Sequence, residues 1–361
     1  MARTRWVRSI LLLLTVALVA SACSKNSSTG SGSGVSLTGA GATFPDPIYE
    51  QWFQDFRAVE ADTKINYQAI GSGGGVQQFT AQTVDFGASD APLQTDEISA
   101  LPSDAVEIPT VLGGVAVAYN LQGVSKPLQL DGDTVAKIFL GDITTWNDPA
   151  IAGQNKGVSL PSTPISVVHR SDESGTTFVF TSWLASQSPD WSTKVGADKA
   201  VQWPVGTGGD GNDGVAAGMT QTDGAIGYLS FDFAVSSNLG VAAIKRADGT
   251  YVAPSVDSIS KAGGILKFPI TPDTNILNST ATGAYPIAST TYLLLYKDQT
   301  DKAKGQALVD FVYWALTKGQ AGATALNYSP LPATIQQEAL KQLDQITSGG
   351  SPLKPSSAVT G

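Results

Sequence analysis

Residue types that carry common enzyme chemistry are scarce in this chain of 361 residues. It contains one histidine, and Cys23 is its one cysteine. Protein zinc sites are usually built from several histidine and cysteine ligands, so we predict neither a metal site of that kind nor a cofactor. A single cysteine also excludes a disulfide within the chain.

Signature motifs of several enzyme classes are missing too. The sequence has no G-x-S-x-G of the α/β hydrolases and no Walker motif, since "GSGGG" at 71–75 lacks the lysine that pairs with phosphates. The segment "SISK" at 258–261 matches the S-x-x-K of penicillin-recognising enzymes, but no SDN or KTG partner accompanies it. The prediction is therefore that the chain is not an enzyme.

Positive charge is in short supply. Lysine and arginine number 22 against 31 aspartates and glutamates, which gives a net charge of −9 and a pI of about 4.6. This balance provides no basic footprint for nucleic acid. It also repels anions at long range, so an anionic ligand would need local dipoles that overcome the global field.

The apolar run near the start, at 10–20, is too short to span a bilayer, which takes about 20 residues. Three arginines precede it and small residues follow, so residues 1–22 read as an export signal. Cys23 then resembles the acylated cysteine of bacterial lipoproteins, although Ala20 stands where leucine is usual. We expect a lipid anchor on the outer face of the cytoplasmic membrane, with 23–34 as anchor and flexible tether.

Alternating apolar patterns and glycine turns predict an α/β fold. Strands are expected at 35–41, 64–70 and 84–89, with a helix after each of the first two. Ligands of such open sheets bind outside the carboxyl ends of the strands. Three candidate loops lie there, at 42–44, 71–75 and 89–90.

A second α/β set follows between two long apolar strands. The strands, at 106–121 and 285–296, are interpreted as crossings between two lobes, with Gly113 and Gly114 as a soft point in the first. Within the set we expect a strand at 165–169, and a glycine-rich turn into a helix at 208–219 followed by a strand "GAIGYLSFDFA".

The segment "HRSDESGTT" at 169–177 allows two interpretations. Ser174, His169 and Asp172 contain the letters of a serine-hydrolase triad, but triad members usually converge from separate elements. Alternatively, the start of a helix at Ser174 offers amide and hydroxyl donors to an oxyanion, with Arg170 as a bidentate partner. Asp172 then either holds Arg170 or caps the helix, and Asp90 either contacts the ligand or caps a turn at a strand end.

Five motifs together resemble one family. "LTGAGATFPDPIYEQW", "IGSGGGVQQF", "VDFGASDAPL", "HRSDESGTTFVFTSWL" and "GGDGNDGVAA" are similar to the phosphate-binding protein of the bacterial high-affinity phosphate ABC transporter, over about residues 36–331. The resemblance implies a two-lobed periplasmic-binding-protein fold that buries one phosphate between its lobes. It also implies the transporter's permease and ATPase subunits as partners.

Carried over position by position, the resemblance implies these phosphate ligands: Thr43, Phe44, Ser72, Asp90, Arg170, Ser174, Gly175 and Thr176. Phe44 and Gly175 would act through their amides, and Asp172 would brace Arg170. Gly73 and His169 depart from the residues usual in the family, but neither is a direct ligand. We also expect Asp90 to accept a hydrogen bond through the proton that phosphate retains near neutral pH and sulfate lacks.

The predicted organisation is a signal at 1–22, a tether at 23–34, lobe I at 35–112 plus 288–347, lobe II at 113–287 and a disordered tail at 348–361. The predicted function is phosphate capture outside the cytoplasmic membrane and delivery to the permease. Two alternatives stay open at this point: a secreted phosphoester hydrolase that uses the same pocket, and a surface adhesin with a vestigial cleft.

Overall fold

The computed structural model describes residues 34–124, 127–270 and 276–361. The predicted export signal, Cys23 and the tether up to residue 33 lie outside these residues. In the described part, no helix is both long enough and apolar enough to cross a bilayer.

The first α/β set forms the predicted parallel sheet. Strands β1 (Val35–Gly41), β2 (Thr63–Ala69) and β3 (Phe86–Ser89) run parallel, with β1 in the middle. Helix α1 (Asp46–Phe56) buries an apolar face that includes Ile48, Trp52 and Phe56, whose spacing of four follows the helical repeat. Helix α2 (Ser72–Thr80) begins inside the glycine run.

Two long strands connect this sheet to the rest of the molecule. Strand β12 (Ala288–Tyr296) lies antiparallel between β3 and β4 (Ala105–Asn120). Strand β4 pairs with β12 up to Gly114 and with β8 (Ala225–Ser230) from Val115 onward. A Cβ at Gly113 would lie 1.9 Å from the Phe44 ring. Close packing therefore explains a glycine at 113, where the sequence suggested only a soft point.

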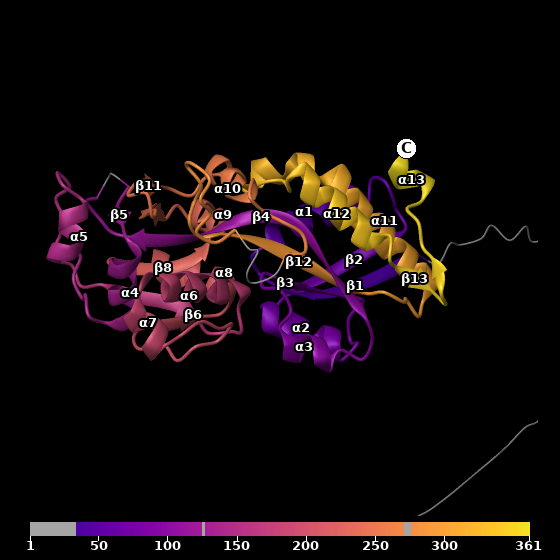
Figure 1. Ribbon diagram of the computed structural model, residues 1–361, viewed down its shortest axis with the longest axis horizontal. Coiled ribbons are helices and arrows are strands. Elements are labelled where there is room, and N and C mark those ends of the chain that lie inside the picture. Colours follow the sequence, from indigo (N-terminus) through magenta and orange to yellow (C-terminus); the bar gives the residue numbers. More distant parts are fainter. Residues whose placement is uncertain (1–33, 125–126, 271–275) are drawn as a thin grey trace, which may run out of the picture. The chain divides into compact units, whose positions relative to one another are not determined.

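The second α/β set continues the same sheet beyond β4. Strand β6 (Ser166–Arg170) runs parallel to β8 and to β7 (Thr207–Gly209). Helices α4 (Gly132–Leu140), α6 (Gly175–Gln187) and α8 (Gly211–Thr220) accompany these strands (Figure 1). This part also contains α5 (Pro149–Gln154), α7 (Pro189–Lys194), α10 (Val256–Gly263), the short strand β9 (Gly240–Val241) beside β4, and a small sheet of β5 (Gln129–Leu130), β10 (Ala243–Lys245) and β11 (Tyr251–Val252).

The predicted strand at 224–234 is too long. Strand β8 ends at Ser230, and helix α9 (Phe231–Ser236) takes up the apolar residues that follow. A run of buried apolar residues looks the same in a buried strand and in a buried helix, so periodicity did not separate the two.

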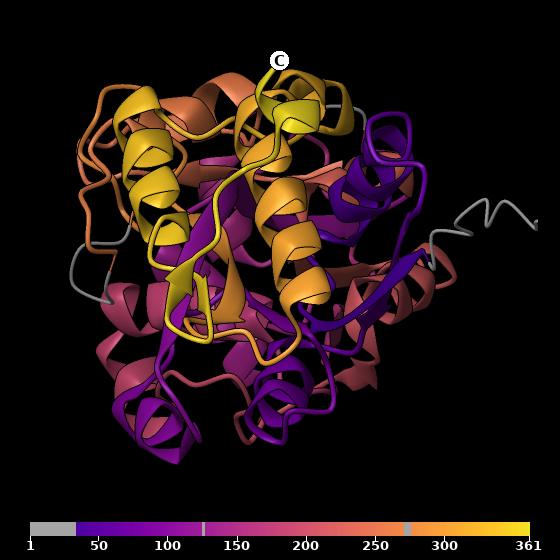
Figure 2. The ribbon, with the colours of Figure 1, turned by 90° about the vertical axis from the view of Figure 1, so that its right-hand side faces the viewer.

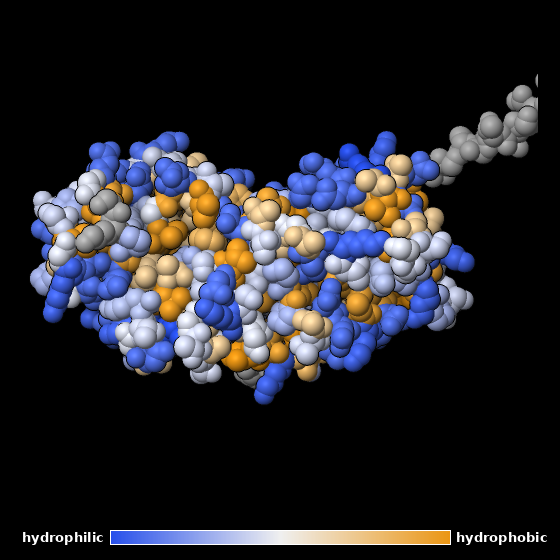
Figure 3. Space-filling view, turned by 90° about the horizontal axis from the view of Figure 1, so that it is seen from above, coloured by the Kyte–Doolittle hydropathy of each residue, from blue (hydrophilic) through white to orange (hydrophobic). Residues whose placement is uncertain are grey.

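Helices near the C-terminus cover one face of the first sheet. Helices α11 (Lys302–Thr317) and α12 (Ala333–Leu343) lie side by side (Figure 2), on the face opposite α2 and α3 (Thr95–Ala100) in Figure 1. A 3₁₀ helix, η1 (Gly319–Leu326), separates them. Seen from above, hydrophilic and hydrophobic side chains are interspersed on the surface (Figure 3).

The prediction of a disordered tail at 348–361 is wrong. Strands β13 (Thr347–Ser348) and β14 (Ser351–Pro352) form a hairpin, and a short helix α13 (Ser357–Thr360) follows. Leu353 and Val359 are buried at 3% and 1% exposure, and the Ser356 amide donates to Asp310 at 2.6 Å. The few apolar residues of the tail find a place in the core, which composition alone did not reveal.

Candidate functional site

The predicted ligand loops meet at the carboxyl ends of the parallel strands. Ser72, in the first turn of α2, accepts hydrogen bonds through Oγ from the amides of Asp90 and Gly175, both at 3.1 Å. Asp90 follows β3, and Gly175 begins α6 of the other set. A Cβ at Gly175 would lie 2.6 Å from Ser72 Oγ and 2.7 Å from Asp90 Cβ. Glycine at 175 therefore allows the two sets of loops to touch.

Helix α8 joins the first loop to the Arg170 loop. Asn212 donates from Nδ2 to Thr43 Oγ1 at 2.8 Å, and the Gly211 amide donates to Asp172 Oδ1 at 3.2 Å. Through these contacts, Thr43, Ser72, Asp90, Arg170 and the start of α6 form one connected group. The residues predicted as ligands from four distant segments of sequence are thus brought together.

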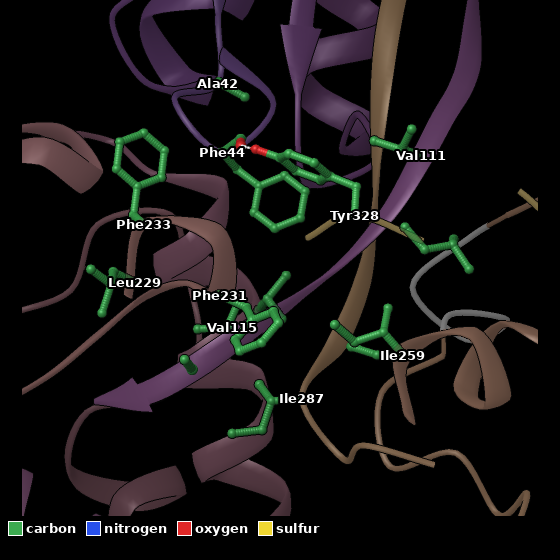
Figure 4. Packing of buried hydrophobic residues seen from close by; sticks show 14 of the residues in the cluster. Ala42, Phe44, Val111, Val115, Leu229, Phe231, Phe233, Ile259, Ile287 and Tyr328 are labelled. Atoms are coloured by element: carbon green, nitrogen blue, oxygen red, sulfur yellow. Dashed lines mark hydrogen bonds between the residues drawn. The ribbon is translucent and has the colours of Figure 1, made fainter. Parts of the chain in front are cut away.

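The backbone of Phe44 is held by the hydroxyl of a tyrosine. The Tyr328 hydroxyl donates to the Phe44 carbonyl at 2.6 Å, and the two rings meet edge to face with centroids 5.7 Å apart (Figure 4). The peptide that carries the Phe44 amide is held by the Thr43 carbonyl, which accepts from the Asp46 amide at 3.4 Å. Both peptides beside Phe44 therefore have a fixed orientation.

Arg170 is buried at 3% exposure and is held by Asp172. Its Nε donates to Asp172 Oδ1 at 2.7 Å, and its Nη2 pairs with Oδ2 of the same carboxylate. Its amide donates to the Tyr228 hydroxyl at 3.1 Å, and the Tyr228 ring stacks on Phe180 with centroids 4.3 Å apart. The guanidinium is thus oriented on one side by a carboxylate, while the backbone is anchored in an aromatic cluster.

The cap of α6 is Ser174, so the alternative that Asp172 caps this helix is wrong. Ser174 Oγ accepts from the Thr177 amide at 3.1 Å, and the Ser174 amide donates to the Lys199 carbonyl at 2.9 Å. A serine at this position stabilises a helix start because it satisfies one of the free amides there. The Asp172 carboxylate instead serves Arg170.

Asp90 is a buried carboxyl at 4% exposure. Burial raises its pKa to about 7, although a hydrogen bond from Thr291 and the charge of Arg170 lower it and the charge of Asp172 raises it further. The turn after β3 is capped by Ser89, whose Oγ accepts from the Ala91 amide at 3.2 Å. The alternative that the Asp90 side chain is a turn cap therefore has no support in the contacts.

Three polar atoms of the predicted ligands lack a partner. In the described residues, seven buried side-chain polar atoms make no hydrogen bond, and three of them are Asp90 Oδ1, Arg170 Nη1 and Thr176 Oγ1. Buried polar groups are normally hydrogen-bonded, and an unsatisfied one costs about 1–3 kcal/mol. Such atoms concentrated in one group of residues indicate a polar ligand.

The triad interpretation of 169–177 does not match the contacts. His169 Nδ1 lies 2.9 Å from the Arg170 carbonyl, so this nitrogen donates to it, and the ring stacks on Trp203 at 4.9 Å. Burial lowers the pKa of His169. Ser174 Oγ and the Asp172 carboxylate make the contacts described above instead of facing the imidazole. Nor do the described residues contain a group of three side chains able to hold a metal ion.

No sequence pattern predicted the residues that hold the predicted phosphate ligands in place. Asn212 lies inside the quoted motif "GGDGNDGVAA", but only its contact with Thr43 gives it a role. Lys199 pairs with Glu97 of α3 across the two sets of loops, and no local pattern marked either residue.

Comparisons with known proteins point to the same family as the five sequence motifs. A family profile described as "PBP superfamily domain" matches residues 26–317. The chain is 41% identical to the phosphate-binding protein PstS of Xylella fastidiosa (strain Temecula1) over 84% of each protein. It is 40% identical to PstS of Haemophilus influenzae, over 83% of this chain and 90% of the relative.

Solved structures agree on the fold. A high-affinity periplasmic phosphate-binding protein with bound phosphate, PfluDING, gives a TM-score of 0.68 at 22% identity, covering 87% of this chain and 99% of the other. A Clostridium perfringens protein described as a putative phosphate ABC transporter substrate-binding protein, also with bound phosphate, gives 0.61 at 18% identity, over 82% and 100%.

Proposed function

The chain belongs to the PstS family of phosphate-binding proteins, within the PBP superfamily, and we propose that it binds inorganic phosphate and delivers it to a membrane permease. The observation that carries this proposal is the set of three buried, unpartnered atoms in the connected loops. Arg170 Nη1 and the Thr176 hydroxyl donate, while Asp90 Oδ1 accepts. A partly protonated oxyanion matches this combination.

The proposed phosphate ligands are those implied by the family resemblance: Thr43, Phe44, Ser72, Asp90, Arg170, Ser174, Gly175 and Thr176. The contacts of Ser72 illustrate why the set suits an anion. Its Oγ accepts from the amides of Asp90 and Gly175, so its single proton is left to donate. The Gly175 amide, which makes this bond in the structure, would exchange it for a bond to phosphate. Asp172, whose carboxylate pairs with Arg170 and accepts from the Gly211 amide, would position the guanidinium without being a ligand itself.

Selection of phosphate over sulfate is assigned to Asp90. Near neutral pH, phosphate still carries a proton, through which it can donate a hydrogen bond to Asp90. Sulfate is fully ionised and has no proton to offer. A site built around a specific buried hydrogen bond rejects an analogue that lacks the partner by roughly 10⁴–10⁵. Asp90 therefore supplies a preference that a purely cationic pocket lacks.

Release and capture are proposed to use a hinge in β4 and β12. We place lobe I at 35–112 plus 288–347 and lobe II at 113–287, as the sequence predicts. Strand β4 changes its partner from β12 to β8 between Gly114 and Val115, close to this boundary. Hinge closure around a ligand is a recognised switching mode.

The proposed location is outside the cytoplasmic membrane, with a lipid anchor at Cys23 and the permease and ATPase subunits of a phosphate ABC transporter as partners. The names of the relatives and the signal-like segment before Cys23 support this placement. Cys23→Ser should move the protein from the membrane fraction into the soluble fraction. A variant that stays membrane-bound would contradict the anchor.

We further propose that the protein has no hydrolase activity, since His169 faces a carbonyl and not Ser174. Hydrolysis of a chromogenic phosphate ester that Ser174→Ala abolishes would contradict this.

Calorimetry on the purified protein tests the binding proposal directly. Phosphate should bind and sulfate should not compete. Arg170→Ala should lower phosphate affinity by about 30- to 5,000-fold, since truncating a buried charge-assisted contact typically costs about 2–5 kcal/mol. Arg170→Lys should also weaken binding, because an ammonium cannot reproduce the planar fork. Absence of phosphate binding by the unmodified protein would refute the function.

A further inference from the structure

Asn212 occupies a fully buried position at the start of α8, directly behind Thr43. Its side-chain amide makes two hydrogen bonds of opposite direction. Oδ1 accepts from the Ser230 amide at 2.9 Å, and Nδ2 donates to Thr43 Oγ1 at 2.8 Å. The Asn212 backbone amide lies 3.4 Å from the same hydroxyl oxygen.

The direction of these bonds follows from chemistry. The backbone N–H of Ser230 can only donate, so the carbonyl end of the Asn212 amide must face it. The NH₂ end then faces Thr43. A flipped amide would place donor against donor at Ser230, which leaves two buried groups unsatisfied.

Thr43 Oγ1 therefore accepts two hydrogen bonds, one from Nδ2 and one from the backbone amide of Asn212. A hydroxyl has two acceptor sites and one proton. With both acceptor sites occupied, the proton of Thr43 points away from Asn212 and is left for another acceptor. The unprotonated oxygens of an oxyanion are acceptors, so a hydroxyl that contacts one of them must have its proton free in this way.

We propose that Asn212 is a positioning residue that makes the Thr43 hydroxyl a committed donor to the bound anion. The inference rests on the proposed phosphate function and adds a residue outside the ligand set. Asn212 and Thr43 belong to segments 169 positions apart that meet only where α8 lies against the loop after β1. Thr43 is therefore prepared as a donor only while these two segments are in contact.

A double-mutant cycle on phosphate affinity tests the proposal. Measured at a pH well above 7, where buried carboxyls of this protein such as Asp90 are ionised, Asn212→Asp keeps the shape but presents a carboxylate that accepts where the amide donated. The Thr43 proton then turns toward it. The added charge also repels phosphate, and this repulsion is the same whether residue 43 is threonine or valine. We expect Asn212→Asp to lower phosphate affinity about 10- to 100-fold more in the Thr43 background than in Thr43→Val.

Thr43→Ser is the matched control, because it retains the hydroxyl and should restore the full effect of Asn212→Asp. Thermal unfolding of each variant, followed by circular dichroism, checks that it is folded. If the aspartate variant does not fold, Asn212→Leu, which is similar in size and uncharged, replaces it in the same cycle.

Equal losses in the Thr43 and Thr43→Val backgrounds would overturn the proposal while leaving phosphate binding intact. Failure of the unmodified protein to bind phosphate would instead overturn the proposed function, and the role of Asn212 with it. A loss of phosphate affinity that depends on the Thr43 hydroxyl supports the positioning role. A merely structural contribution of Asn212 would lower the affinity equally with and without that hydroxyl.

Discussion

Replacing Asp90 with asparagine should stabilise the ligand-free protein increasingly as the pH rises. The Asp90 carboxyl is buried, its Oδ1 has no partner, and burial raises its pKa from 3.8 to about 7. The folded protein thus holds this proton to a higher pH than the unfolded chain does. Folding stability from this group is greatest at low pH and declines as the pH rises from about 4 to about 7.

The size of the effect follows from the pKa difference of about three units. Each unit corresponds to about 1.4 kcal/mol, so the full penalty on the charged carboxylate is on the order of 4 kcal/mol above neutral pH. The asparagine side chain does not titrate, so the variant lacks this pH-dependent penalty on folding stability. Asp232 and Glu107, whose pKa values burial also raises to about 7, contribute equally to both proteins and cancel in the difference.

Urea unfolding without phosphate, at a series of pH values between about 4 and 8, measures this difference. The free energy of unfolding of Asp90→Asn minus that of the unmodified protein should grow by roughly 2–4 kcal/mol across the range. Asp62→Asn, at an exposed position, is the control and should show no such trend. A difference that stays constant with pH would refute the reasoning.

The same substitution should damage selectivity. An amide at position 90 can donate to sulfate, so the ratio of phosphate to sulfate affinity should fall well below the roughly 10⁴–10⁵ expected of a site built on one specific hydrogen bond. Competitive calorimetry measures the ratio, and an unchanged ratio would contradict the assignment. A variant that is more stable but less selective would show that the burial of Asp90 serves ligand recognition at the expense of stability.

Three further predictions follow from other contacts. Lys199→Met removes the ion-pair partner of Glu97, and we expect phosphate to dissociate several-fold faster in stopped-flow measurements because this pair joins the two sets of loops. An unchanged rate would contradict that link. Gly175→Ala should abolish tight binding because its Cβ would lie 2.6 Å from a site hydroxyl, whereas Gly153→Ala, with open space around it, should bind like the unmodified protein. Deleting residues 353–361 removes two buried apolar side chains and should lower the free energy of unfolding by about 3–6 kcal/mol, since each contributes about 1.5–3 kcal/mol; a loss below about 1 kcal/mol would mean that the tail packs weakly.

The alternation of strands and helices was predictable from local patterns. Helix α1 shows its apolar spacing in the sequence, and the glycine-rich turns mark the ends of β1 and the start of α2. Because parallel strands present their carboxyl ends at one edge, the loops at 42–44, 71–75 and 89–90 could be assigned to one site before their contacts were known. Charge and hydrogen-bonding capacity then marked Arg170 and the start of α6 as suited to an oxyanion.

Other features depend on residues that are distant in sequence. The pKa of Asp90 is set by burial, which no local pattern of "VDFGASD" specifies. The end of β8 at Ser230 was mispredicted because an apolar run shows that a segment is buried but not which backbone geometry it adopts. The packing of the tail was missed because its few apolar residues form no pattern, and only their contacts in the fold show that Leu353 and Val359 are buried.

Local sequence was enough to indicate which side chains are suited to an anion, because donor and acceptor groups follow from residue type and the ends of strands follow from local pattern. The orientation of these groups depends on the folded chain. Asn212 directs the Thr43 proton, and Asp172 directs the Arg170 fork. Hydrogen bonds require atoms within about 3 Å and the correct alignment, and for Asn212 and Thr43 that condition is met only when chain segments far apart in sequence are packed together.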